Sequence, residues 1–222
     1  MLPVYKEKLE SIKNEVYAIG SQVAKANELA LEAIESKNYK LFNDAKNELI
    51  NLEKTSNKID NMIVTTLALH APEAKDLRVL VSYLKITNEI VRASTNTRSF
   101  IKSFSRIVSS EIDLDKINEY GIPLHKSAIL AIKTALKIIQ IENENETEDY
   151  FHKVVVEESK TDDLYSMIEK NILKMITKNK ELSKDYFEAL SSLRRLEKVA
   201  DRAASIANLL LYAHLGGEIH QA

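Results

Sequence analysis

The apolar residues of this chain follow one another in steps of three and four along nearly its whole length. In the first long run they recur at Leu9, Ile12, Val16, Ile19, Val23, Ala26, Ala30 and Ala33. Such a seam lies along one side of an α-helix and suits long antiparallel helices that pack side by side. No alternating pattern of a half-buried strand competes with it. The sequence therefore predicts an all-α protein.

Helix-breaking residues are few, with four glycines and three prolines among 222 residues. Pro72 interrupts the chain in LHAPEAKDLR, and Gly121 and Pro123 interrupt it in YGIPLHK. Proline cannot donate a backbone hydrogen bond, so these points are expected to separate helices. Only Gly20 lies inside a periodic run, where a close contact between helices would explain it. Polar residues that could cap helices give weaker boundaries between these breaks. Together they predict six helices, at 4–36, 39–69, 73–108, 124–142, 148–178 and 184–214, with a linker between the third and the fourth.

Three helices, a linker and three further helices suggest an internal duplication. The expected units are 1–110 and 124–222, joined by a linker at 111–123. Laying the third helix over the sixth pairs Val91 with Glu197, although identities are few. Periodicity leaves two arrangements open, namely two three-helix bundles in line or one continuous bundle.

Charge and composition exclude several classes of function. The chain has 31 basic and 33 acidic residues, so bulk charge gives no argument for nucleic-acid binding. The absence of cysteine excludes disulfides, thiolate metal sites and cysteine nucleophiles. No nucleophile with an adjacent base, phosphate-cradling glycine loop or nucleotide motif is found, so an enzyme is not expected. The N-terminus lacks the apolar run of a signal peptide, and no stretch of about 18 apolar residues occurs. We expect a cytoplasmic protein that reaches a membrane only through a partner.

Acidic residues lie beside the core-facing sides of two helices. Glu197 and Asp201 lie on adjacent turns of the last helix, and Glu158 and Asp162 have the same spacing in the fifth. If the two edges face each other, four carboxylates converge. Converging carboxylates repel unless they are protonated, paired with cations or bridged by metal. An oxygen-only shell would suit Mg²⁺, Ca²⁺, Mn²⁺ or iron, and zinc less well.

Ion pairing along the helices offers an explanation without metal. Glu197 can pair with Arg194, and Asp201 with Lys198, each three residues before it. Acidic spacings of four also arise by chance among 33 acids. The histidines form no Glu-x-x-His ligand pair. A solvated or capping role is therefore expected for His70, His125, His152, His214 and His220.

The stretch SLRRLEKVADRAASIANLLLY resembles the signature helix of the PhoU family, with Glu197 and Asp201 on its Glu-x-x-x-Asp positions. EESKTDDLY resembles the family's preceding helix, with Glu158 and Asp162 on its acidic positions. ALHAPEAKDLRVLVSYLKI resembles the junction between its second and third helices. The resemblance implies two three-helix bundles in tandem and a metal cluster, of iron or another cation, on the acidic helices. These four carboxylates are the ligands that it implies here.

The first repeat departs from the family's acidic pattern. Val91 and Thr95 replace the acidic pair of the third helix. Leu49 replaces an acid of the second helix and leaves Glu53 alone. We therefore predict that the first repeat binds no metal cluster. In the second repeat, Arg202 stands beside the acidic pair and would lower metal affinity if it reached the carboxylates.

The resemblance also implies a function, that of a regulatory adaptor of phosphate uptake and phosphate-starvation signalling. Such a protein would contact the ATPase subunit of a phosphate ABC transporter and a phosphate-responsive sensor histidine kinase, and would damp the response when phosphate is plentiful. It would lie in the cytoplasm, peripheral to the inner membrane through its partners, and could form a homodimer. Two alternatives stay open: a metal-dependent helical enzyme or iron-handling protein, and a regulator of a different phosphate carrier.

Overall fold

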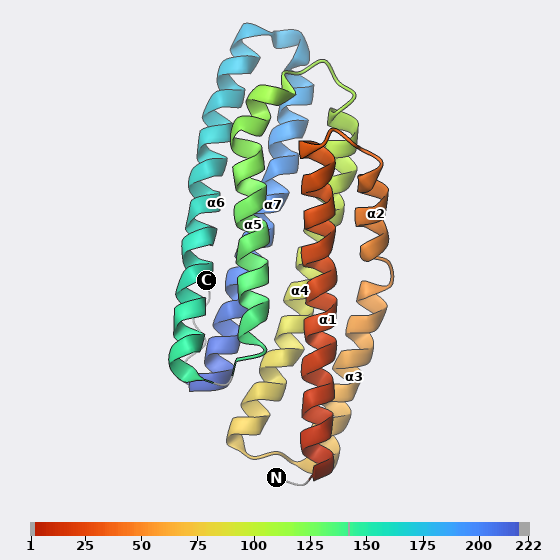
Figure 1. Ribbon diagram of the computed structural model, residues 1–222, viewed down its shortest axis with the longest axis vertical. Coiled ribbons are helices and arrows are strands. Elements are labelled where there is room, and N and C mark those ends of the chain that lie inside the picture. Colours follow the sequence, from red (N-terminus) through yellow and green to blue (C-terminus); the bar gives the residue numbers. More distant parts are fainter. Residues whose placement is uncertain (1–2, 142, 218–222) are drawn as a thin grey trace.

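The computed structural model describes residues 3–141 and 143–217, which fold into two groups of long helices (Figure 1). The first repeat contains α1 (Pro3–Glu35), α2 (Leu41–Glu48), α3 (Leu52–His70) and α4 (Ala74–Ile107). The second repeat contains α5 (Leu114–Ile138), α6 (Glu144–Lys178), the short 3₁₀ helix η1 (Lys180–Leu182) and α7 (Ser183–Leu215). Because α2 and α3 together take the place of one helix, the predicted all-α fold of two three-helix bundles is confirmed.

The two repeats lie side by side (Figure 1). Helices α4 and α7 make the most extensive contact between them, and α1 packs against α5. Buried apolar residues of both repeats form one contiguous core. Helix α6 lies on the outside, and of the helices in the described ranges it contacts α5, α7 and η1 alone. In the described ranges, no helix is both long enough and apolar enough to span a bilayer.

The apolar seam of α1 faces this core as predicted. Leu9 is half-buried, and the other seven positions of the seam are buried. Gly20 lies where α1 approaches α5, since a Cβ atom at this position would lie 2.3 Å from Leu136 Cδ2. The close helix contact expected at Gly20 is therefore confirmed.

The predicted linker at 111–123 is wrong over most of its length, because α5 covers it from residue 114 onward. The Asp113 side chain caps this helix by accepting a hydrogen bond from a backbone N–H at 3.2 Å. Pro123 therefore lies inside α5, where it removes one backbone hydrogen bond. Ile117 and Leu124 on either side of the expected boundary are buried, and their burial offsets that loss.

The second predicted helix, 39–69, is interrupted between α2 and α3. Asn51 adopts a left-handed backbone conformation with φ of 63°, which asparagine tolerates better than most residues. At this break the carbonyl oxygen of Leu49 accepts a hydrogen bond from Arg98 Nη2 of α4 at 2.9 Å. The side chain of Arg98 thus satisfies a backbone group that a continuous helix would have paired internally.

A buried polar cluster joins the two repeats. Asn27 Nδ2 donates to the carbonyl oxygen of Val23 at 2.9 Å and to Thr97 Oγ1 at 2.8 Å. His125 of α5 contacts Asn27 Oδ1 through Nε2 at 3.3 Å, and its ring packs edge-on against Phe100. The prediction of a solvated or capping role is wrong for His125, which is only 1% exposed.

Candidate metal centre in the second repeat

Three carboxylates come together where α6 packs against α7. Glu158 and Asp162 lie one turn apart on α6, and Asp201 faces them from α7. Each residue offers one oxygen, and the three oxygens lie within 4.8 Å of one another. Asp162 is exposed, and the other two are half-buried. This acidic cluster is therefore open to ions from solvent.

The core pattern of α7 holds Asp201 at its place. Leu196, Val199, Ala200 and Ala203 are fully buried and fix which side of the helix faces inward. Asp201 then lies at the edge of this apolar side, toward α6. On α6, buried Thr161 and Tyr165 flank Asp162 in the same way. The register of two core seams therefore positions the carboxylates.

Glu197, the fourth predicted ligand, lies outside the acidic cluster. Its side chain is 9% exposed, and its Oε1 accepts a hydrogen bond from Lys198 Nζ at 3.3 Å. Its Oε2 is buried, accepts no hydrogen bond from the described residues and lies 4.0 Å from Arg194 Nε. A buried carboxylate oxygen left in this state is costly, and a nearby cation would satisfy it.

Burial and neighbouring charges disfavour the ionised forms of Glu158 and Glu197. Burial raises the pKa of Glu158, and the charges of Asp162 and Asp201 raise it further. Burial also raises the pKa of Glu197, with a further contribution from Asp201, while Lys198 and Arg194 oppose the shift. Negative charge on Glu158 and on Glu197 is therefore disfavoured beside the other carboxylates. A divalent cation would relieve this repulsion, so the donor set fits a hard, oxygen-binding metal.

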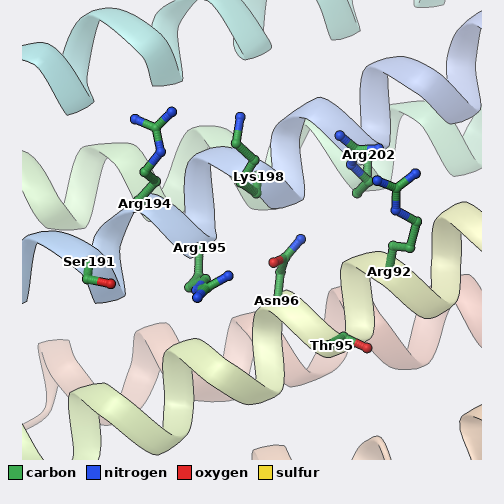
Figure 2. Close-up of a pocket in the computed structure, with 8 residues that line it drawn as sticks. All are labelled: Arg92, Thr95, Asn96, Ser191, Arg194, Arg195, Lys198 and Arg202. Carbon is green, nitrogen blue, oxygen red and sulfur yellow. The ribbon is translucent and has the colours of Figure 1, made fainter. Parts of the chain in front are cut away.

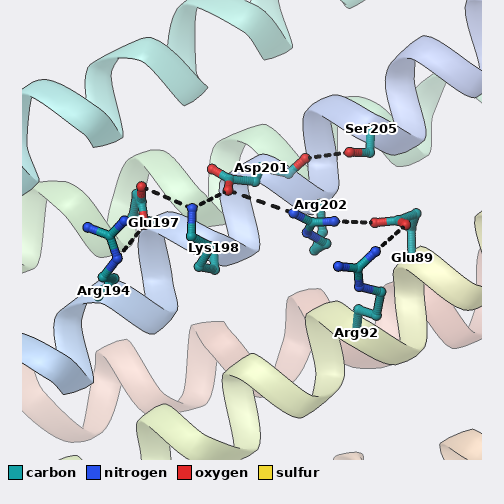
Figure 3. Close-up of polar contacts among 8 residues, drawn as sticks. All are labelled: Glu89, Arg92, Arg194, Glu197, Lys198, Asp201, Arg202 and Ser205. Atoms are coloured by element: carbon teal, nitrogen blue, oxygen red, sulfur yellow. Dashed lines mark hydrogen bonds and ion pairs between the residues drawn. The ribbon is translucent and has the colours of Figure 1, made fainter. Parts of the chain in front are cut away.

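Lys198 supplies part of the counter-charge within the chain (Figure 3). Its Nζ donates to Asp201 Oδ2 at 2.6 Å as well as to Glu197. The ion pairs predicted from the helical spacing, Arg194 with Glu197 and Lys198 with Asp201, are thus confirmed. The same carboxylates thus converge and also form ion pairs. A metal ion that bound them would therefore compete with the Lys198 ammonium group.

Arg202 turns mainly toward the first repeat. Its Nη1 donates to Glu89 Oε2 of α4 at 3.0 Å, while its Nη2 lies 3.8 Å from Asp201 Oδ2. Glu89 Oε1 also accepts a hydrogen bond from Arg92 at 3.1 Å. Arg202 therefore reaches one carboxylate of the acidic cluster at ion-pair distance and links the two repeats. Figure 3 shows a ladder of alternating charge that contains Arg194, Glu197, Lys198, Asp201, Arg202, Glu89 and Arg92.

The corresponding positions of the first repeat carry different contacts. Thr95 Oγ1 donates to the carbonyl oxygen of Val91 at 3.0 Å within α4. Leu49 is fully buried, and Glu53 is exposed. The absence of a metal cluster from the first repeat remains a prediction. Sequence reasoning missed the pairing of Glu89 with Arg202, because nothing local indicates that α4 packs on α7.

Fold and site together define an all-α protein of two three-helix repeats, with a carboxylate cluster between two helices of the second repeat. A family model described as the PhoU domain matches residues 16–103 and again residues 124–210. The chain therefore belongs to the PhoU family, which confirms the resemblance seen in its motifs.

Named relatives align over almost the whole chain. A phosphate-specific transport system accessory protein PhoU homolog of Borreliella burgdorferi is 25% identical over 216 residues, covering 96% of each chain. One from Clostridium acetobutylicum is 20% identical over 217 residues, covering 97% of this chain and 96% of the relative.

Two solved structures share the fold. PhoU from Pseudomonas aeruginosa superposes with a TM-score of 0.84 at 18% identity, covering 96% of this chain and all of the other. The phosphate transport system regulatory protein PhoU from Streptococcus pneumoniae gives 0.82 at 18% identity, covering 98% of this chain and 100% of the other. At this level of identity the two structures show the fold alone.

Proposed function

We propose that this chain is a cytoplasmic regulatory adaptor of phosphate uptake and not an enzyme. The observation that carries the proposal is the match of the PhoU domain to both repeats. Relatives that align over 96% or more of the chain are named as accessory proteins of phosphate-specific transport systems. Family membership and full-length alignment together support a role in controlling phosphate transport.

In this proposal the adaptor acts by protein contact. Its partners are the ATPase subunit of a phosphate ABC transporter and a phosphate-responsive sensor histidine kinase, whose output it damps when phosphate is plentiful. The outer helix α6 supports such a role, because it exposes the large apolar side chains Val156, Met167 and Leu173. A partner protein, or a second copy of the chain, could cover that surface.

A cation in the second repeat is the structural part of the proposal. Glu158, Asp162 and Asp201 would hold it, with Glu197 beside them, and iron, Mn²⁺, Mg²⁺ or Ca²⁺ would suit these oxygens better than zinc. A bound cation would neutralise the repelling carboxylates and fix α6 against α7. Lys198 would have to leave the carboxylates when the cation arrives.

Deletion of the gene in its native organism tests the adaptor proposal. Expression of phosphate-starvation genes at high phosphate should rise in the deletion strain and return to its basal level with the wild-type gene. Complementation with Asp201→Ala should restore repression only in part, whereas Asp163→Ala, at an exposed neighbouring position on α6, should restore it fully. Unchanged starvation-gene expression in the deletion strain would refute the adaptor role.

A second candidate function is control of a different phosphate carrier. The observation that favours it is the loss of the acidic pair in the first repeat, where Val91 and Thr95 stand. If it holds, deletion should still change phosphate uptake in a strain that lacks the ABC transporter. Uptake that no longer responds to deletion in that strain would exclude it.

A further inference from the structure

A basic cavity of about 540 Å³ lies between α4 and α7, along the contact between the repeats (Figure 2). Five cationic side chains line it, namely Arg92 from α4 and Arg194, Arg195, Lys198 and Arg202 from α7. The other lining residues, Thr95, Asn96 and Ser191, are uncharged and polar. None of the lining side chains is acidic, and all except Thr95, whose hydroxyl donates to Val91, have a donor group that could bind an anion.

Neighbouring carboxylates neutralise this cavity only in part. Glu89 pairs with both Arg92 and Arg202. Two carboxylates of α7 pair with Arg194 and Lys198. Arg195 takes part in no ion pair or hydrogen bond with the described residues. In the gap itself, Arg92, Arg195 and Arg202 thus meet the single carboxylate of Glu89, and an anion would relieve the remaining repulsion.

The lining side chains differ in direction, because Arg194 and Lys198 point away from α4 (Figure 2). Figure 2 shows Arg195 and Asn96 extending into the space between α7 and α4, with the guanidinium groups of Arg92 and Arg202 next to each other at one end. Arg195 and Arg202 are seven positions apart, or ~10 Å along a helix at 1.5 Å per residue. One phosphate group cannot reach both ends, whereas a short chain of phosphates can.

The lining also indicates what the ligand lacks. It has no aromatic ring on which a base could stack and no aliphatic side chain to cover an apolar group. Arginine matches phosphate oxygens well, since its planar fork donates two parallel hydrogen bonds. The cationic and polar ends of these side chains therefore suit an anion that carries several phosphate groups.

We propose that the cavity between α4 and α7 binds a short inorganic phosphate chain, such as pyrophosphate or tripolyphosphate. This site goes beyond the adaptor role and depends on none of its protein partners. It is separate from the acidic cluster between α6 and α7, although Lys198 lines the cavity and also pairs with Asp201. The inter-repeat contact would then sense an anion, because both repeats contribute cations.

Isothermal titration calorimetry of the full chain with tripolyphosphate tests the site, in buffer with EDTA so that no metal bridges ligand and protein. One tripolyphosphate should bind per chain, and at least tenfold more tightly than orthophosphate. Arg195→Gln and Arg92→Gln should each weaken binding about tenfold, the loss expected for a charge-assisted hydrogen bond. Lys184→Gln removes the same charge from an exposed position of α7 outside the cavity, and should leave the affinity unchanged.

Three results would overturn the proposal. Absence of tripolyphosphate binding is the first, and equal weakening by Lys184→Gln, which would indicate general attraction, is the second. Tighter binding of ATP or of a hexaglutamate peptide than of tripolyphosphate is the third, because it would assign the cavity to a nucleotide or to an acidic protein segment. Thermal melts of the variants should match the wild type, which separates lost binding from lost folding. The starvation-gene assay does not depend on these results, so the two proposals can fail separately.

Discussion

Acid is expected to destabilise the fold through His125. The ring is buried between the repeats, and Asn27, which donates through Nδ2 to Val23 and Thr97, presents its oxygen to His125 Nε2. Nε2 therefore carries the hydrogen, and Nδ1 is buried without a hydrogen-bond partner among the described residues. A proton added to Nδ1 would create a buried charge with nothing to pair with it.

The expected size of the effect follows from the pKa of His125. Burial lowers this pKa from 6.5 to about 3 in the folded protein. The folded state therefore keeps its full stability above pH 6.5, where His125 is neutral in both states. It loses stability as the pH falls below 6.5, because the unfolded chain binds a proton at His125 that the folded chain excludes. The free energy of unfolding should fall by about 1.4 kcal/mol per pH unit in this range, or about 2 kcal/mol between pH 8 and pH 5.

Urea unfolding at pH 8, 7, 6 and 5 measures this loss when the wild type is compared with His125→Gln. The variant has no titrating group at this position and escapes the acid-dependent loss. The amount by which its unfolding free energy lies below that of the wild type should therefore shrink by about 2 kcal/mol between pH 8 and pH 5. Carboxylates such as Glu158 and Glu197 titrate in both proteins and cancel in the difference. His152→Gln, at an exposed position of α6, controls for the change of residue type. A deficit that stays constant across the four pH values would refute the reasoning.

Three further predictions concern contacts of α7. Glu89 and Arg202 pair between the repeats at 3.0 Å, so a double-mutant cycle with both changed to Gln should give a coupling of about 1 kcal/mol in urea unfolding, and zero coupling would contradict this. Lys198→Met should strengthen Mn²⁺ binding severalfold in calorimetry, because it removes the ammonium group that a cation must displace; weaker binding would show that Lys198 is no competitor. Leu196→Ala should cost about 3 kcal/mol of unfolding free energy, and Leu130→Ala, at a half-exposed position, well under that; equal losses would contradict the assigned core.

Periodicity predicted the helices well where the burial of one side decided the structure. The apolar seam of α1 repeats over many turns, so one irregular position does not change the predicted helix. The boundary predicted at Pro123 is wrong. Asp113 caps α5 ten residues earlier, and buried residues on both sides of Pro123 stabilise a helix that contains the proline. The cost of one lost hydrogen bond is smaller than the gain from a long buried face.

The buried role of His125 had a signal in the sequence that was overlooked. His125 stands three and seven positions before Ala128 and Ile132, both buried, which places it on the core side of α5. Its partner Asn27 is 98 positions away. The side of the helix could therefore be read from spacing, but the hydrogen bond that makes burial tolerable could not.

The candidate metal site was predicted only in part, because local spacing shows which side of a helix a residue occupies but not its partners on other helices. Spacing of four and family resemblance indicated the acidic residues of α6 and α7, and the structure brings Glu158, Asp162 and Asp201 together. Glu197 lies outside this cluster, where its side chain is largely buried and accepts a hydrogen bond from Lys198. Contacts between the repeats, such as Arg202 with Glu89 at a separation of 113 positions, depend on packing that local sequence does not encode.

The proposed cation site in the second repeat is tested most directly by elemental analysis of the untagged protein. The wild type and Asp163→Ala should each carry about one metal ion per chain, as three converging carboxylates allow. The double variant Glu158→Ala, Asp201→Ala should carry none. Metal that is absent from the wild type, or that the double variant retains, would contradict the site.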